Sequence, residues 1–205
     1  IIANNKIIEE LSNLSRLYYD YWFTQFDFPG PDNKPYRISG GSMSYSEELG
    51  REVPSDWKLE SLSASCSIID CLHSKKPDYC FENEEYHLMQ LENIEDNGLI
   101  NTSDRYYVSK KDYELWTSRI EVHQDDIVVT NAGRVGAVAQ LSKGQKMGIG
   151  RNITAIRPVS INPTYLNLAF TSHDMNRQIK LNTDSGAFFG SLNVKVIKKL
   201  MILRP

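Results

Sequence analysis

The chain of 205 residues lacks several features that would place a protein at once. It has no apolar run of the roughly 20 residues that a membrane-spanning helix needs, and no basic segment leading into an apolar one, as a secretory signal has. We therefore expect a soluble, cytoplasmic protein with no membrane partner. The sequence starts at Ile1, inside a helical pattern, rather than at a methionine. We expect a fragment or processed chain with one domain and an appendage.

Cysteine is also scarce. Cys66, Cys71 and Cys80 give an odd number without a C-x-x-C pair, which argues against a disulfide framework. His73 and His87 lie nearby in the sequence, so a zinc site can be imagined, but ligands at this spacing are not metal-like. We expect reduced cysteines that pack as small apolar side chains, with no metal and no cofactor.

Motifs of DNA-modifying catalysis are missing or defective. An amino-group DNA methyltransferase needs a glycine-rich cofactor loop and an Asn/Asp-Pro-Pro-Tyr/Phe tetrapeptide, whereas residues 162–165 read Asn-Pro-Thr-Tyr with no such loop before them. A metal-dependent nuclease needs two carboxylates and a lysine around Mg²⁺. Pro31-Asp32 with Asp56-x-Lys58 matches this short pattern, but Asp32 falls in a Gly/Pro loop instead of a strand. No phosphate loop, nucleophile elbow or catalytic triad is evident, so we expect no enzyme.

The net charge of −3 is the sum of two halves of opposite sign. Residues 1–104 hold 8 Lys and Arg against 19 Asp and Glu, a net charge of −11, whereas residues 105–205 hold 15 against 7, a net charge of +8. A basic half suits a nucleic-acid partner, and an acidic half suits the protein-facing remainder. Chance segregation of surface charge is the alternative.

The first 21 residues repeat apolar side chains at spacings of four and three, which is a heptad pattern. Asn4 falls on an a position of that pattern, where a polar residue can fix the register of a coiled coil. The pattern is too short for a self-sufficient coiled coil and needs a partner helix, unless the helix packs on its own domain. The expected interhelical seam consists of Ile7, Leu11, Leu14, Tyr18 and Tyr21.

Two prolines and a glycine in the segment 28–31 cannot continue a helix. We therefore divide the chain into a helix at 1–27, a linker rich in Gly, Pro and Ser at 28–55, and a domain at 56–205. The fold class predicted for the whole is α+β.

Within the domain, alternating and β-branched runs predict strands, and capping residues predict two helices. The longer helix should run from about Pro163 to Lys180, with Asn162 as its N-cap and Tyr165, Leu168, Ala169 and Ile179 as its apolar residues. A short helix should start near Asn193, with Val194, Ile197 and Leu200 inward. The predicted strands lie near 86–91, 105–108, 127–130, 135–141 and 153–157.

The richest local pattern joins the apolar runs at 127–129 and 135–139 through a polar turn. Gly133 and Gly136 permit positive φ there, and Arg134 lies between them. On local pattern alone this is an ordinary hairpin. In that case Arg134 could be structural, pairing with Asp125 or Asp126.

Three groups of motifs, in this order along the chain, resemble the specificity subunits of type I restriction–modification systems. The N-terminal group resembles the family's spacer helix, its exit and the entry into a target recognition domain. The two later groups resemble the body and the ending of that domain. The matching segments are 2–11, 18–23, 25–29 and 52–59; then 125–136 and 151–158; and finally 185–193 and 200–205.

The resemblance implies one target recognition domain with part of a spacer helix, bound to one half of a bipartite site in double-stranded DNA. It implies a methyltransferase subunit that supplies the S-adenosylmethionine chemistry, a motor subunit for restriction, and a second half-subunit or dimer mate paired through the helix. Gly133, Gly136, Gly186 and Ser191 match positions with roles in the fold. The alternative class is a non-catalytic interaction module whose basic face binds a non-DNA anion.

DNA-binding residues are expected in turns and polar loops, because Arg, Lys, Asn and Gln read bases and Lys, Ser, Thr and Tyr hold phosphates. Lys110 and Lys111 have a simpler alternative as the exposed start of a helix, and Tyr106 and Tyr107 as strand core. The expected DNA-binding residues are Arg105, Tyr107, Lys110, Lys111, Asn131, Arg134, Lys143, Lys146, Arg151 and Asn152.

Overall fold

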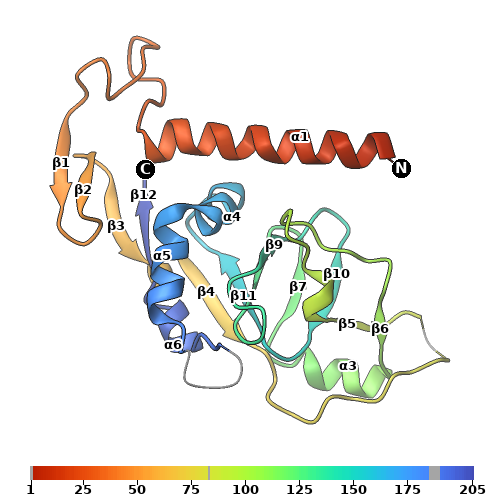
Figure 1. Ribbon diagram of the computed structural model, residues 1–205. Helices are drawn as coiled ribbons and strands as arrows, with labels where there is room; N and C mark the ends of the chain where they lie inside the picture. Colours follow the sequence, from red (N-terminus) through yellow and green to blue (C-terminus); the bar gives the residue numbers. More distant parts are fainter. Residues whose placement is uncertain (1, 83, 185–189) are drawn as a thin grey trace.

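A computed structural model describes residues 2–82, 84–184 and 190–205, except for the side chains of Ile2 and Asn5. The fold is α+β, as the sequence predicts: a long N-terminal helix, two four-stranded sheets and C-terminal helices (Figure 1). The part of the ending motif that covers 185–189, with Gly186, lies outside the described residues. None of the described helices is long and apolar enough to cross a membrane.

The N-terminal helix consists of α1 (Ile2–Tyr19) and a π-helical turn, η1 (Asp20–Thr24). In the π turn the N–H of Gln25 donates to the carbonyl of Asp20, five residues back, at 2.8 Å. The helix therefore ends at Thr24, somewhat before the expected residue 27. Phe26, with a φ of 64°, turns the chain away from the helix axis.

The segment 28–55 contains a hairpin that the sequence analysis did not predict. Strands β1 (Met43–Ser46) and β2 (Arg51–Pro54) pair antiparallel, and β3 (Lys58–Ser61) follows and pairs with the last strand, β12 (Met201–Arg204). Phe28 stacks on Trp57 at 5.1 Å between ring centroids. The segment thus packs on the domain through its own small apolar cluster.

The central sheet is antiparallel in the order β4 (Cys66–Asp70), β11 (Ile153–Pro158), β8 (Ile127–Thr130), β9 (Val138–Gln140). Alternate side chains of β8 serve two cores, as the pleat of a strand requires. Ile127 and Val129 pack towards the C-terminal helices, and Val128 packs towards the second sheet. The sheet is therefore buried on both faces.

The second sheet has the order β6 (Tyr106–Tyr107), β5 (His87–Met89), β10 (Lys146–Ile149), β7 (Glu121–His123), with β5 and β10 parallel. Helix α3 (Lys110–Trp116) contributes Tyr113 and Trp116 to a cluster with Leu88 and Val108. Two short helices complete the description: α2 (Leu62–Ser65), between β3 and β4, and η2 (Leu91–Asn93), after β5.

The C-terminal helices confirm Asn162 as a cap and the start of a short helix near Asn193, and they correct one length. Asn162 accepts from the N–H of Tyr165 and starts α4 (Pro163–Thr171), and Asn193 likewise caps α6 (Val194–Ile197). The single helix expected from 163 to 180 is two helices, because Ser172 adopts an extended conformation and caps α5 (His173–Asn182). All five predicted strands are present as β5, β6, β8, β9 and β11.

Candidate nucleic-acid interface

Three of the expected DNA-binding residues meet at one end of the two sheets. Asp70 closes β4, Asn131 follows β8, and Arg151 and Asn152 join β10 to β11. The backbone N–H of Asn131 donates to the carbonyl of Asn152 at 2.9 Å. Asp70 is paired in register with Thr154. We call this end of the sheets, with Asp70, Asn131, Arg151 and Asn152, the Arg151 end.

Residues at the Arg151 end differ in accessibility. Arg151 is exposed and has no hydrogen-bond or ion-pair partner among the described residues. Asn152 holds the turn with a φ of 64°. Asn131 is only 8% exposed, and its side-chain amide donates to Thr154 Oγ1 at 3.1 Å. Arg151 is therefore the cation here that is free to meet a phosphate, while Asn131 holds the strands together.

Arg134 is tied to the loop that follows η2. Its Nη1 donates to the carbonyl of Ile94 at 2.6 Å, and its Nη2 pairs with Asp96. The expected alternative, a pair with Asp125 or Asp126, is not what forms. The turn around Arg134 has positive φ at Gly133 and Gly136, as the sequence predicts.

Lys143 and Lys146 lie at the opposite end of the sheets, because the turn between β9 and β10 reverses the chain there. Lys143 is exposed. Lys146 pairs with Glu121 at 2.9 Å, and the hydroxyl of Tyr113 donates to the same carboxylate at 2.7 Å. Burial acts to raise the pKa of Glu121, but the hydrogen bonds from Lys146 and Tyr113 outweigh it and hold the pKa below its usual value.

Replacing Lys146 with Ala is expected to destabilise the fold at pH 7 and much less at pH 3. A carboxyl group whose pKa is lowered by folding stabilises the fold above its unfolded pKa, and this stability is lost as the pH falls through the folded value. Urea unfolding of both proteins at several pH values measures the effect. Lys143→Ala, which removes an exposed lysine from the same turn, is the control. A difference that persists unchanged at pH 3 contradicts the assignment.

The remaining expected residues lie in or next to β6 and α3. Arg105 is exposed, and its Nε donates to the carbonyl of Thr102 at 3.0 Å. Tyr107 is half-buried in β6, with its ring centroid 6.1 Å from that of His87. Lys110 and Lys111 are exposed in the first turn of α3, which agrees with their alternative as a helix start. These residues are separated along the chain from the Arg151 end.

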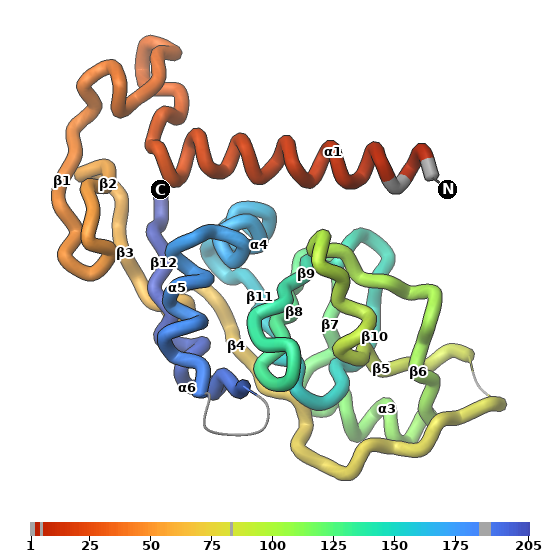
Figure 2. The backbone as a smooth tube through the Cα atoms, in the orientation of Figure 1, coloured from red at the N-terminus to blue at the C-terminus, as the bar shows by residue number. Residues whose placement is uncertain are grey.

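The connection from β4 to β5 contains Cys71, His73 and Cys80 but none of the expected DNA-binding residues, and its described residues, 71–82 and 84–86, form no helix or regular strand (Figure 2). Phe81 is 88% exposed, and its ring centroid lies 4.7 Å from that of Tyr79. Lys76 Nζ lies 3.8 Å above the ring of Tyr106. The mixture of aromatic and basic residues in this connection is the sequence feature that indicates a candidate nucleic-acid contact.

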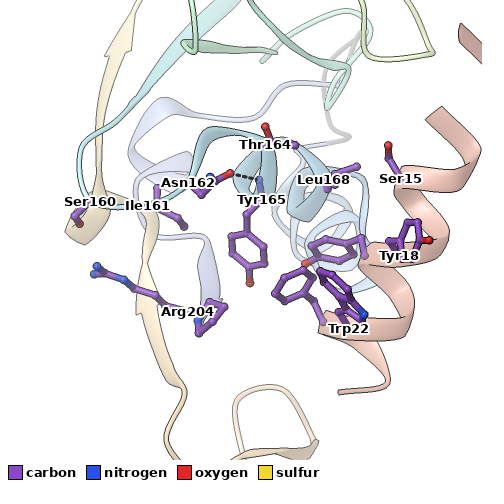
Figure 3. Close-up of a pocket in the computed structure, with 13 residues that line it drawn as sticks. Ser15, Tyr18, Trp22, Ser160, Ile161, Asn162, Thr164, Tyr165, Leu168 and Arg204 are labelled. Atoms are coloured by element: carbon purple, nitrogen blue, oxygen red, sulfur yellow. Dashed lines mark hydrogen bonds between the residues drawn. The ribbon is translucent and has the colours of Figure 1, made fainter. Parts of the chain in front are cut away.

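The helix presents a separate, apolar surface. The expected seam residues on α1 are exposed, with Ile7 and Leu11 at 57%, Leu14 at 46% and Tyr18 at 53%. Beyond Tyr18 this surface enters a hollow of about 700 Å³ between the helix, α4 and the end of β12 (Figure 3). The hollow is lined mainly by Tyr18, Tyr19, Trp22, Phe23, Ile161, Tyr165, Leu168 and Pro205.

The π turn changes which side chain continues the seam. A heptad pattern places Tyr21 after Tyr18, but Trp22 is the residue that lines the hollow beside Tyr18, with their ring centroids 5.8 Å apart. A π turn adds one residue to a helical turn, so the apolar face is displaced by one position. Trp22 therefore joins the candidate seam.

Tyr19 fastens the helix to the domain. It is 8% exposed, and its ring centroid lies 5.7 Å from that of Tyr165 on α4. Burial raises the pKa of Tyr19 to about 12, so the hydroxyl stays protonated at neutral pH. The hydroxyl of Tyr165 in turn donates to the carbonyl of Leu203. The end of α1 is thus part of the core although its seam is exposed.

The sequence matches no protein-family model and no curated protein, but solved structures share the fold. One, described as the structural basis of complex assembly and conformational transition of the type I restriction–modification system, has a TM-score of 0.52 at 16% identity, over 100% of this chain and 43% of the other. The crystal structure of the HsdS subunit from Thermoanaerobacter tengcongensis has a TM-score of 0.53 at 18% identity, over 99% and 42%.

The chain therefore has the fold of type I specificity subunits, helix included, and the resemblance found in the sequence is confirmed at the level of the fold. It spans about two-fifths of the length of these structures.

Proposed function

We propose that the chain is a target recognition domain with part of a spacer helix, and that it binds one half of a bipartite site in double-stranded DNA for a type I restriction–modification complex. The observation that carries this proposal is the match of fold over 99% of the chain to an HsdS subunit. The basic net charge of residues 105–205 supports a DNA partner.

The DNA contact begins at the Arg151 end. Arg151 projects from a turn held by the backbone of Asn131 and Asn152, and a rigid turn at the end of a sheet is a common position for binding residues. Arg105, Tyr107, Lys110, Lys111, Lys143 and Lys146 are further candidates for phosphate contacts. Arg134 contributes to the DNA contact indirectly, because it holds the 94–96 loop in place through Ile94 and Asp96.

Replacing Arg151 with Glu is expected to weaken binding of a mixed-sequence duplex and to lower the slope of log affinity against log salt by about one unit, because one phosphate contact is lost. Fluorescence anisotropy at several salt concentrations measures both. Arg177→Glu, on the exposed face of α5, is the charge-matched control. Equal slopes for Arg151→Glu and the unchanged chain would remove Arg151 from the interface, and salt-independent binding would favour the non-DNA module.

The chain contributes recognition and not catalysis. Asn162, which begins the defective tetrapeptide, is used as a helix cap, and Asp32 lies in an exposed turn. Methylation is supplied by a methyltransferase subunit and restriction by a motor subunit. A second half-subunit or dimer mate lies along the seam of α1.

The purified chain is accordingly expected to transfer no methyl group from labelled S-adenosylmethionine to duplex DNA and to cut no duplex in Mg²⁺. An active amino-group methyltransferase in the same assay is the positive control. Methyl transfer above the protein-free background would overturn the non-catalytic assignment.

A further inference from the structure

The start of the connection 71–86 brings together three different metal-binding side chains. Asp70 ends β4, Cys71 follows it, and His73 comes two residues later. Their ligand atoms, a carboxylate oxygen, the Cys71 Sγ and an imidazole nitrogen, all lie within 4.8 Å of one another. His73 Nε2 is 2.7 Å from Asp70 Oδ2.

The three ligand types together select a metal class. Thiolate and imidazole favour zinc and related transition metals over Mg²⁺ and Ca²⁺. Zinc binds S, N and O ligands at roughly 2.0–2.3 Å, so the ligand atoms of a tetrahedral site lie about 3.3–3.8 Å apart. His73 can make the required adjustment, because its side chain is 66% exposed.

A second observation comes from the residue beside this cluster. Asn131 Nδ2 lies 3.5 Å from Asp70 Oδ1, yet the buried Oδ1 of Asn131 accepts no hydrogen bond from the described residues. A buried acceptor without a donor costs free energy. Asn131 therefore borders the cluster through Nδ2 and keeps one acceptor to which a water molecule can donate.

We propose that Asp70, Cys71 and His73 bind a divalent transition-metal ion, with Zn²⁺ as the best match, and that water occupies the fourth position. The ion anchors the start of the connection, residues 71–73, to the end of β4. Arg119 Nη1 already donates to the carbonyl of Cys71 at 2.9 Å, so the anchor adds to an existing contact. The site lies at the Arg151 end but does not depend on DNA binding by the chain.

Cobalt titration of the chelator-treated, reduced full chain tests the proposal. One equivalent of Co²⁺ is expected to give the near-ultraviolet charge-transfer absorption of a cobalt–thiolate bond, and one equivalent of Zn²⁺ to remove it. Cys71→Ser should abolish this absorption. Cys66→Ser and Cys80→Ser are the matched controls and should retain it, because neither cysteine belongs to the cluster.

His73→Ala covers the case in which Cys71→Ser does not fold, because His73 is exposed. This variant should bind Co²⁺ at least about tenfold more weakly and keep the circular dichroism spectrum of the unchanged chain. Absence of the thiolate absorption in the unchanged chain, or its loss in Cys66→Ser or Cys80→Ser but not in Cys71→Ser, would overturn the proposal. None of these readouts uses DNA, so failure of the proposed function would leave them unchanged.

Discussion

Arg157→Ala is expected to lower the free energy of unfolding by about 3–5 kcal/mol, because it leaves a buried carboxylate without its cation. The side chain of Asp126 is 1% exposed. Arg157 donates to it through Nε at 2.7 Å and Nη2 at 2.6 Å, and the N–H of His123 donates at 3.0 Å. This pair joins β11 of the central sheet to the turn before β8.

Denaturant unfolding followed by tryptophan fluorescence measures this loss. Arg37→Ala is the matched control, because Arg37 lies 3.6 Å from Glu52 with both side chains about half exposed, and exposed pairs contribute only about 0–1 kcal/mol. Similar losses for Arg157→Ala and Arg37→Ala would mean that the Asp126 pair is no more than a surface contact.

Replacing Leu11 and Leu14 together with Ala is expected to raise the Kd for pairing with a complementary half-subunit by roughly 100-fold or more. Burying one leucine side chain contributes about 1.5–3 kcal/mol, and each 1.4 kcal/mol is a factor of ten in affinity. Both side chains are half exposed in the single chain, so the domain itself should keep its stability within about 0.5 kcal/mol.

Sedimentation equilibrium and thermal unfolding of the same samples separate these two effects. Leu17→Ala is the control, since Leu17 is 64% exposed on α1 but lies beside the seam. If the double variant pairs normally, the seam is misassigned. A large fall in its melting temperature would instead place Leu11 and Leu14 in the core of the domain.

Strong local signals allowed part of the fold to be predicted. The run at 127–130 is buried on both faces of its strand, and Asn162 and Asn193 act through bonds to residues two or three positions away. Strand β10 was missed because Gly148 and the following Gly150 resemble a turn. A Cβ on Gly150 would lie 2.5 Å from the carbonyl oxygen of Met89, so the glycine serves a close approach between strands.

The candidate site was less accessible to prediction, because its partners are distant in sequence. Arg134 pairs with Asp96, and Arg157 pairs with Asp126. Both pairs depend on how the sheets stack. The hydrogen bond from Asn131 to Thr154 also joins two residues that are distant in the sequence. The sequence predicted polar turns with exposed residues. It could not show which residues of those turns stabilise the fold and which, like Arg151, have no partner among the described residues.

The π turn between Tyr19 and Gln25 fixes the rotation of the proposed spacer helix, about its own axis, relative to the domain. Each residue of an α-helix advances the chain by 1.5 Å and about 100°. Deleting one residue from Asp20–Thr24 would restore continuous α-helical geometry, but it would rotate α1, with its seam and Tyr19, by that angle relative to the chain that follows Gln25. The direction in which the domain faces when its spacer is paired would then change, although no residue at the Arg151 end had been altered.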